Sequence, residues 1–327
     1  MTLLVITIVV ALAFDFTNGF HDTANAVATS VSTRALSPRL AVLIAAVANL
    51  AGAFATTAVA KTVGKGIIDS GLASTHTVLA AVIGAIVWNL ITWWLGLPSS
   101  STHALIGGLI GAALASAGTV HWNGVLDKVV IPMVASPLIG LVLGWTVMLA
   151  ILWAFRHRNA HRLNRGFRRL QVGSAAAMAY SHGTQDAQKT MGVITLALVT
   201  SGHLKSFHVP VWVIIASATA MGFGTYAGGW RIIRTLGRRI VALTPPSGFA
   251  AELSASTVLL FSAYAYALPV SSTHVITSTV MGVGATRRRS AVRWGVAGNI
   301  IGAWILTIPG AAAAAATTFA IGHLAIG

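Results

Sequence analysis

The sequence predicts an all-α polytopic membrane protein, an inverted repeat of two five-segment halves with about 10–12 transmembrane segments and broken or re-entrant helices at the midplane. Three observations support this fold class: an apolar composition, apolar segments of membrane-spanning length, and motifs that occur twice. Hydrophobic residues make up 56% of the 327 residues and charged residues only 8%, which excludes an ordinary soluble domain. The chain has no cysteine, so disulfides and thiolate metal sites are excluded as well.

The apolar segments recur from one end of the chain to the other. They cover residues 3–33, 40–60, 77–97, 100–118, 129–155, 171–200, 210–230, 250–268, 270–286 and 294–321. Most have about 20 residues or more, the length that crosses a bilayer as a helix. The first segment resembles a signal peptide, but it has no basic region before it and no small-residue cleavage site, so we expect a mature helix.

The positive charge gathers in short stretches between the apolar segments. The net charge is +15, and residues 156–169 alone carry six arginines and no acid. Short basic loops stay on the cytoplasmic side. We therefore expect 156–169, 231–239 and 287–293 inside, both termini outside, and a multi-pass protein of the plasma membrane. Because the charge follows the loops, the expected partner is the lipid bilayer and not a nucleic acid.

The two halves of the chain carry matching motifs. The first half contains LPSSSTH at 97–103, and the second half contains the similar motif LPVSSTH at 268–274. Each half also contains one Gly-x-x-Asp motif in an apolar setting. An odd number of crossings per half inverts the second copy, which is the architecture of many secondary transporters. We expect a first repeat over 1–155, a basic cytoplasmic loop over 156–169 and a second repeat over 170–327.

Each Gly-x-x-Asp motif places an aspartate inside a long apolar segment. Asp22 and Asp186 lie in the first and sixth segments, whose length suits two half-helices that meet at a break. An intramembrane carboxylate is costly unless it is protonated, paired or bound to a cation, although an aspartate that caps a helix needs no ligand. Asn25 can offer an oxygen to a cation or an amide to an anion. Its repeat partner is Lys189, with Gln188 beside it.

A run of three hydroxyls follows a proline in each half. These residues are Ser100, Ser101 and Thr102 in the first half and Ser271, Ser272 and Thr273 in the second. One hydroxyl suffices to cap the next helix, a contribution of about 1 kcal/mol. Three hydroxyls beside free backbone N–H groups and the positive end of a helix dipole favour a site for a tetrahedral oxyanion. His103 and His274 follow, and the pattern leaves open whether they hold local hydrogen bonds or contact the substrate.

An anion site beside two aspartates requires a cation between them. At about 4 Å and an effective dielectric near 20, two unit charges repel by about 4 kcal/mol. We expect Asp22 and Asp186 to hold a coupling ion in each repeat, H⁺ or Na⁺, with neighbouring oxygens from Thr23 and Gln185. If the ion is Na⁺, the two aspartates are its metal ligands. No other cofactor is expected, and co-transport follows from the electrostatics.

These motifs resemble those of the inorganic phosphate transporter (Pit) family, bacterial type. The resemblance covers essentially the whole chain and rests on NGFHDTANAVATSVSTRALSP at 18–38, SHGTQDAQKTMGVI at 181–194 and the two SSTH motifs. It implies a symporter that imports inorganic phosphate, in bacteria often with protons and as a metal–phosphate complex, elsewhere with sodium. It also implies that GFAAE, at 248–252, bears a functional glutamate, Glu252.

By the same resemblance, the hydroxyl runs together with Asn25, Gln188 and Lys189 form the phosphate site. Two positions depart from the family pattern. Gln185 stands where an asparagine is usual, which would loosen that cation site, and only Asn49 is found where many members carry a glutamate.

The residue before Asp22 bears on the coupling ion. His21 stands where the sodium-coupled animal members have asparagine, and a His–Asp pair can hold and release a proton near neutral pH. This favours proton coupling over sodium coupling. The alternative is that His21 only hydrogen-bonds a neighbouring helix.

Two other functional classes compete with a symporter. A passive anion channel would use the same anion site, but it has no need for paired aspartates. An intramembrane hydrolase would pair Ser101 or Ser272 with His103 or His274, but residues two apart seldom face each other on a helix. The sequence therefore predicts a transporter and not an enzyme, and it leaves a homodimer open.

Overall fold

The computed structural model describes residues 1–68 and 73–326, which are almost entirely helical. Its elements are α1 (Thr2–Ser32), α2 (Pro38–Ala53), α3 (Ala58–Gly66), α4 (Thr75–Leu95), α5 (Ser101–Ala115), α6 (Trp122–Val125), η1 (Leu126–Val130), α7 (Ile131–Ala154), α8 (Ala160–Thr200), α9 (Val211–Ala227), α10 (Trp230–Arg234), η2 (Thr235–Arg239), α11 (Pro245–Tyr266), α12 (Ser272–Ala285), η3 (Arg289–Ala291) and α13 (Trp294–Ile326). Within those residues, β-structure is limited to one isolated bridge between Ile68 and Val120. The predicted all-α class is confirmed.

Several helices have the length and composition of membrane spans. Among the described residues, five helices qualify alone, and up to seven if each bent pair is one span. The bent pairs are α2 with α3, at 73°, and α9 with α10 and η2, at 58°. Large apolar side chains such as Val47, Trp94 and Phe223 are more than half exposed on the outside of the bundle. An apolar outer surface of this kind suits contact with lipid.

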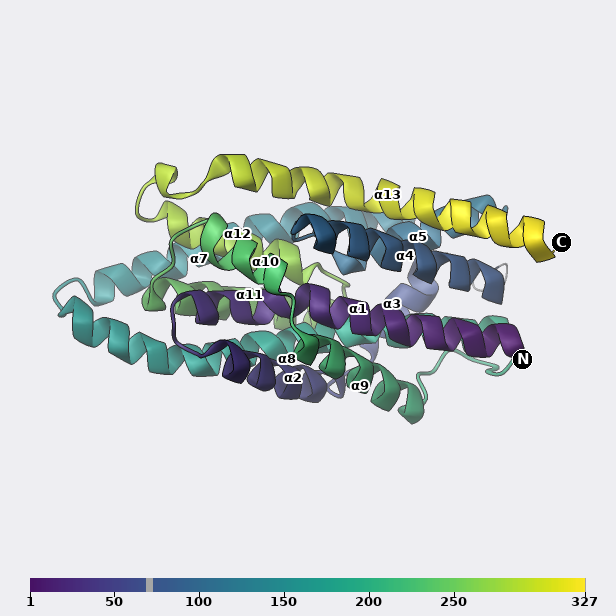
Figure 1. The fold of residues 1–327 in the computed structure, drawn as a ribbon, viewed down its shortest axis with the longest axis horizontal. Helices are drawn as coiled ribbons and strands as arrows, with labels where there is room; N and C mark the ends of the chain where they lie inside the picture. Colours follow the sequence, from purple (N-terminus) through teal and green to yellow (C-terminus); the bar gives the residue numbers. More distant parts are fainter. Residues whose placement is uncertain (69–72, 327) are drawn as a thin grey trace.

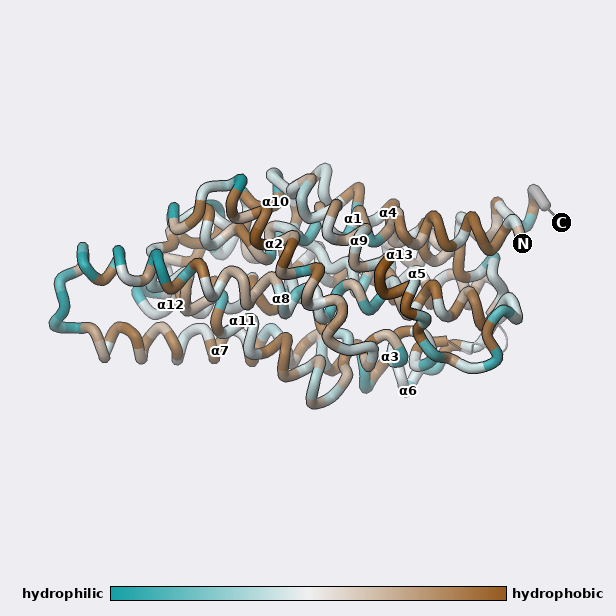
Figure 2. The backbone as a smooth tube through the Cα atoms, turned by 90° about the horizontal axis from the view of Figure 1, so that it is seen from below, coloured by the Kyte–Doolittle hydropathy of each residue, from teal (hydrophilic) through white to brown (hydrophobic). Residues whose placement is uncertain are grey.

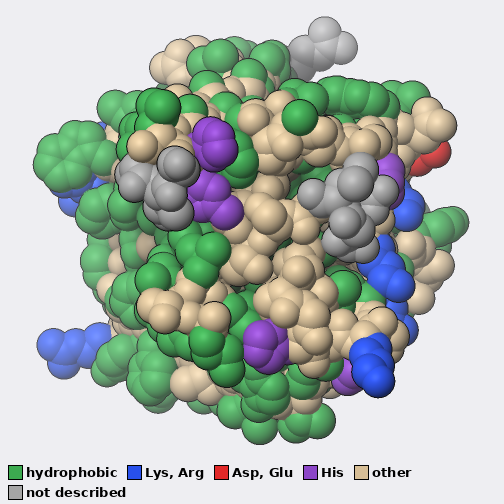
Figure 3. Space-filling model, turned by 90° about the vertical axis from the view of Figure 1, so that its right-hand side faces the viewer, with side chains coloured by type: hydrophobic (Ala, Val, Ile, Leu, Met, Phe, Trp, Pro, Cys, Tyr) green, Lys and Arg blue, Asp and Glu red, His purple; other side chains and the backbone are tan. Residues whose placement is uncertain are grey.

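The long helices lie side by side along the longest axis of the molecule, with both termini at one end and the turn between α7 and α8 at the other (Figure 1). Hydrophobic residues follow the shafts of the helices, and the α7–α8 turn is hydrophilic (Figure 2). Seen from the end that carries the termini, hydrophobic side chains cover much of the rim (Figure 3). This distribution fits a molecule that lies across a bilayer.

The helices that carry the two aspartates are continuous, so the predicted breaks at Asp22 and Asp186 are wrong. α1 and α8 pass through both motifs as unbroken helices, and neither aspartate caps a helix end. The glycine of each motif serves packing instead. A Cβ on Gly19 would lie 2.5 Å from the Met221 carbonyl of α9, and one on Gly183 would lie 2.2 Å from the Asn49 carbonyl of α2. Each glycine therefore permits close helix contact beside an aspartate, and the bends occur in the partner helices.

Gly183→Ala is expected to lower the thermal unfolding temperature of the purified protein by several degrees. Its added methyl would overlap a backbone oxygen of α2, and overpacking of this kind costs about 1–3 kcal/mol. Gly173→Ala is the matched control, because Gly173 lies on the same helix with nothing within 4 Å of an added Cβ. Equal unfolding temperatures for the two variants in detergent would contradict this packing role.

The predicted basic loop is mostly helical. Only a short turn separates α7 from α8, and α8 begins at Ala160, inside the 156–169 stretch. The Asn159 side chain caps this helix, because its oxygen accepts hydrogen bonds from the backbone N–H groups of His161 and Arg162. The predicted 231–239 loop is likewise helical, as α10 and η2. Charge alone did not distinguish a loop from the exposed end of a helix.

Helix packing has the pattern that an inverted repeat would produce. α1 packs on α9 and α8 packs on α2; α5 packs on α13 and α12 packs on α7. The corresponding helices α1 and α8 run in opposite directions along the molecule (Figure 1). The repeat itself and its boundaries stay predictions, and these pairings are consistent with them.

The arrangement of the ends leads to a topology prediction. We expect Arg158→Cys, in the α7–α8 turn, to be protected from an impermeant thiol reagent added outside intact cells. His203→Cys, just after α8 at the opposite end, should react, and both positions are exposed in the structure. The native chain has no cysteine, so the unmodified protein gives the background labelling. Labelling of Arg158→Cys alone would place the termini inside the cell.

Candidate functional site

A polar layer divides the apolar core of the bundle into two parts. One core cluster contains Phe14 of α1 and Ala187 of α8, and the other contains Ala24 of α1 and Ala179 of α8. The stretches of α1 and α8 between these clusters carry buried polar residues, including both aspartates. The polar layer therefore lies well inside the helical bundle, where α1 and α8 pack against each other.

Asp22 and Asp186 meet in this layer with His182. One ligand atom from each of the three residues lies within 4.8 Å of the other two, and all three side chains are buried. We call these three residues the carboxylate centre. The sequence predicts one ion site per repeat, but the structure brings both carboxylates into one centre.

The starts of two helices point hydroxyls at the carboxylate centre. At the start of α5, Ser101 donates to the Asp22 carboxylate and lies 2.5 Å from Oδ1 of Asn18. At the start of α12, Ser272 donates to Oδ2 of Asp186 over 3.1 Å. Each half thus supplies one aspartate and one serine that bind each other.

The remaining hydroxyls divide between capping and the centre. Ser100 and Ser271 cap their helices by accepting the backbone N–H groups of the two following histidines at 3.2 Å. Thr273 accepts from Nδ2 of Asn25 at 2.9 Å and contacts Oδ1 of Asp22 at 3.4 Å. Thr102 is buried beside Ser101. Capping and contact with the centre are both present, carried by different residues of each run.

His21 makes both of the contacts considered for it. Its Nδ1 lies 2.7 Å from Oδ1 of Asp22, and its Nε2 lies 3.2 Å from the Thr92 hydroxyl and 3.4 Å from the Ser99 hydroxyl. It therefore pairs with the aspartate and links α1 to the α4–α5 region at the same time.

Asp186 has nitrogen partners of its own. Lys189 forms a buried ion pair with Oδ1 of Asp186, and Nε2 of His182 lies 2.8 Å from Oδ2. Nδ1 of His182 is 3.1 Å from Oδ1 of Asn49, which ties α8 to α2. His182 was not among the site residues predicted from the sequence. Its position four residues before Asp186, on the same helix face, was the available signal.

Three predicted site residues bond outside the centre. Gln188 accepts the backbone N–H groups of Val59 and Ala60 at the start of α3, over 2.8 and 3.2 Å. Gln185 donates to the Leu259 carbonyl over 3.1 Å. Thr23 donates to backbone carbonyls, including that of Thr225 at 3.1 Å. In this conformation these side chains connect helices, and no hydrogen bond among the described residues joins them to the side chains of the centre.

Glu252 occupies a separate polar cluster. Its Oε1 accepts from the Thr29 hydroxyl at 2.5 Å and from Nε2 of Gln171 at 3.2 Å, and its other oxygen accepts from Ser174. The cluster joins α1, α8 and α11 and is fully buried. Glu252 therefore accepts hydrogen bonds from three side chains of its own cluster.

His103 and His274 meet each other instead of a serine. Their ring centroids are 4.7 Å apart in an edge-on arrangement, and His274 stacks on Trp304 at 3.9 Å. The Ser101 and Ser272 hydroxyls are directed at carboxylates. The serine–histidine pairs that a hydrolase would need are not formed among the described residues.

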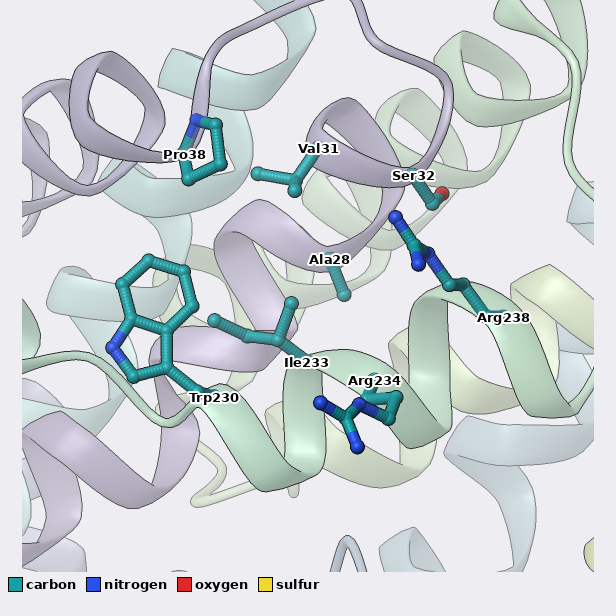
Figure 4. A pocket seen from close by; sticks show the side chains of 8 residues that line it. All are labelled: Ala28, Val31, Ser32, Pro38, Trp230, Ile233, Arg234 and Arg238. Carbon is teal, nitrogen blue, oxygen red and sulfur yellow. The ribbon is translucent and has the colours of Figure 1, made fainter.

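A cavity of about 240 Å³ lies apart from the carboxylate centre. It opens between the end of α1 and the α10–η2 helix, with Arg234 and Arg238 on one side and Trp230 on another (Figure 4). By contrast, the residues of the centre are at most 2% exposed. The structure therefore represents a conformation in which the centre is closed to water.

Comparison with known proteins gives consistent matches along the whole chain. The sequence profile of the phosphate transporter family matches residues 18–315. A Mycobacterium bovis protein named "Probable low-affinity inorganic phosphate transporter" is 51% identical over 326 residues, which cover 98% of this chain and 78% of that protein. A Bacillus subtilis protein of the same name is 46% identical over 94% of each chain. A solved structure named "The sodium-dependent phosphate transporter" matches with a TM-score of 0.84 and 26% identity, covering 99% of this chain and 100% of that one.

Proposed function

Since this chain belongs to the phosphate transporter family, we propose that it is a secondary active symporter that imports inorganic phosphate together with protons across the plasma membrane. Its family and relatives are transporters and not enzymes. The names of the relatives support phosphate as the substrate. The direction of transport, the driving ion and the site are parts of the proposal.

One observation carries the proposal: two helix starts, one from each half, direct a serine hydroxyl at a carboxylate in the same buried centre. Helix starts with free N–H groups bind phosphate. A bound phosphate would compete with Asp22 and Asp186 for the hydroxyls of Ser101 and Ser272. Carboxylates that lose their hydrogen-bond donors need a positive charge nearby. The same positive charge is needed because the carboxylates and the phosphate repel each other. Phosphate binding and cation binding therefore favour each other.

The partners of the two aspartates support a proton as that cation. Asp22 contacts His21, and Asp186 contacts both His182 and Lys189. These nitrogen groups occupy oxygens that a hard metal cation would need as ligands. Histidine also gains or loses a proton between about pH 5 and 8. The two carboxylates face one lysine ammonium, so one added proton balances the charge of the centre.

Uptake of labelled phosphate into proteoliposomes tests this function. We expect accumulation when the outside is more acidic than the lumen, with no sodium present. Accumulation that requires a sodium gradient at constant pH would replace the proton by sodium and leave phosphate import standing. Equilibration without accumulation under either gradient would instead identify a passive channel.

A further inference from the structure

A third carboxyl lies in the polar layer, and the proposed transport cycle does not yet use it. Asp15 is on α1, two turns before Asp22, and is completely buried. Two turns place it on the same face of α1, about 10 Å closer to the end that carries the N-terminus. Neither of its oxygens has a hydrogen-bond partner among the residues that the structure describes.

Other unsatisfied polar groups surround Asp15. The Thr190 hydroxyl and Nδ2 of Asn18 lie near its carboxyl, yet neither is in hydrogen-bonding geometry with any described residue. Asn18 also leads toward the centre, because its Oδ1 accepts from Ser101, which in turn donates to Asp22. A row of polar groups therefore lies between Asp15 and Asp22, hydrogen-bonded from Asn18 to Asp22 but not from Asp15 to Asn18.

Ser101 has one proton for these two acceptors. When its hydroxyl proton points at Asn18, a hydrogen bond between Ser101 and Asp22 requires a proton on the carboxyl. When it points at Asp22, the Asn18 amide must turn its NH₂ group toward the serine, which moves its oxygen elsewhere. The hydrogen bonds from Asn18 through Ser101 to Asp22 thus have two proton arrangements. Whether Asp22 is protonated determines which of the two forms.

The charges around Asp15 come from one helix. Asp186 and Lys189 of α8 face it. Among the other long helices packed on α1, His76 of α4 packs on a phenylalanine ring of α13, and Tyr226 of α9 is 65% exposed. Glu252 of α11 binds Thr29, which lies 14 residues further along α1. An ionised carboxylate without a donor is costly to bury. The closed site therefore offers an ionised Asp15 no hydrogen-bond donor among the described residues.

We propose that Asp15 is a second proton-carrying group of the transporter, loaded and emptied once per cycle on the N-terminal side of the carboxylate centre. The O–H bond of Asp15 forms with a proton taken from water at one membrane face while the site is open there. It breaks after the site opens to the other face, where water accepts the proton and hydrates the carboxylate. This inference rests on the proposed proton coupling.

Proton loading of Asp15 would assist phosphate binding. An ionised Asp15 would add a third carboxylate to those of Asp22 and Asp186, against one ammonium from Lys189. The neutral form removes that repulsion. By thermodynamic reciprocity, bound phosphate must favour the protonated form by the same factor.

Asp15→Asn separates proton transport from phosphate binding, because asparagine has the shape of the neutral acid but cannot release a proton. We expect accumulation driven by a pH gradient to fall at least tenfold in proteoliposomes. Exchange of labelled for unlabelled phosphate, at equal pH on both sides, should stay within about twofold of the native rate. The exchange should also lose the decline at high pH expected of the native protein. Ser217→Ala is the control, since Ser217 is also buried and polar, has no hydrogen-bond partner among the described residues and cannot carry a proton. It should leave both assays unchanged.

Two results would overturn the role of Asp15. Native accumulation in Asp15→Asn would make this residue a structural acid, and loss of exchange together with accumulation would make it part of phosphate binding or folding. The native protein supplies the separate test of the proposed function: if it does not accumulate phosphate under a pH gradient, proton coupling fails. The exchange assay needs no driving gradient. It therefore distinguishes failure of the proposed role of Asp15 from failure of proton coupling in the native protein.

Discussion

Asp22→Asn is expected to reduce phosphate uptake about a hundredfold or more while the protein stays folded. In the structure the carboxylate accepts from Ser101 and contacts His21 and Thr273. Asparagine keeps the shape, but it loses the charge and one of the two acceptors. Truncating one partner of a buried, hydrogen-bonded charge pair costs about 2–5 kcal/mol of binding free energy, and each 1.4 kcal/mol corresponds to about tenfold. Phosphate exchange should fall with accumulation, unlike in Asp15→Asn, because the centre itself is altered.

Asp127→Asn is the matched control for this change. Asp127 is exposed near the start of the helix that continues into α7, so its loss should leave uptake within about twofold. Both variants should be purified and compared by thermal unfolding before uptake is measured. An Asp22→Asn protein that folds normally and accumulates phosphate at the native rate would remove Asp22 from the coupling site.

Much of the fold follows from local features of the sequence. The apolar segments of 77–97 and 294–321 became α4 and α13 with small shifts at their ends, because an apolar stretch in a membrane satisfies its backbone only as a helix. The doubled hydroxyl motifs became equivalent helix starts for the same local reason. Serine after proline caps a helix wherever that helix lies in the bundle.

The long-range contacts of the site could not be predicted from the sequence. Asp22 and Asp186 were each expected in a separate ion site, but their meeting depends on how α1 crosses α8. A glycine before each aspartate is compatible with a break or with close packing, and only the neighbouring backbone decides between them. The bond from Gln188 to the start of α3 likewise depends on a neighbour far away in sequence.

The double variant Ser101→Ala with Ser272→Ala is expected to weaken phosphate uptake at least tenfold, chiefly by raising the phosphate concentration needed for half-maximal rate. Each hydroxyl would donate a charge-assisted hydrogen bond to phosphate, worth about 1.5–3 kcal/mol. In the closed structure the same hydroxyls donate to Asp22 and Asp186. Their removal therefore also abolishes the competition between phosphate and the carboxylates for these donors, which couples phosphate binding to proton binding. The pH dependence of uptake should therefore change together with the affinity.

The control for this change is Ser100→Ala with Ser271→Ala, which removes the two capping hydroxyls and leaves those directed at the carboxylates. Each lost cap should cost about 1 kcal/mol of stability, visible as a lower unfolding temperature, with little change in apparent phosphate affinity. The two double variants thus separate helix stability from substrate binding at adjacent positions of the same two helices. Equal losses of affinity in both would mean that Ser101 and Ser272 act only by supporting the helix starts, and the phosphate site would then have to be sought elsewhere in the polar layer.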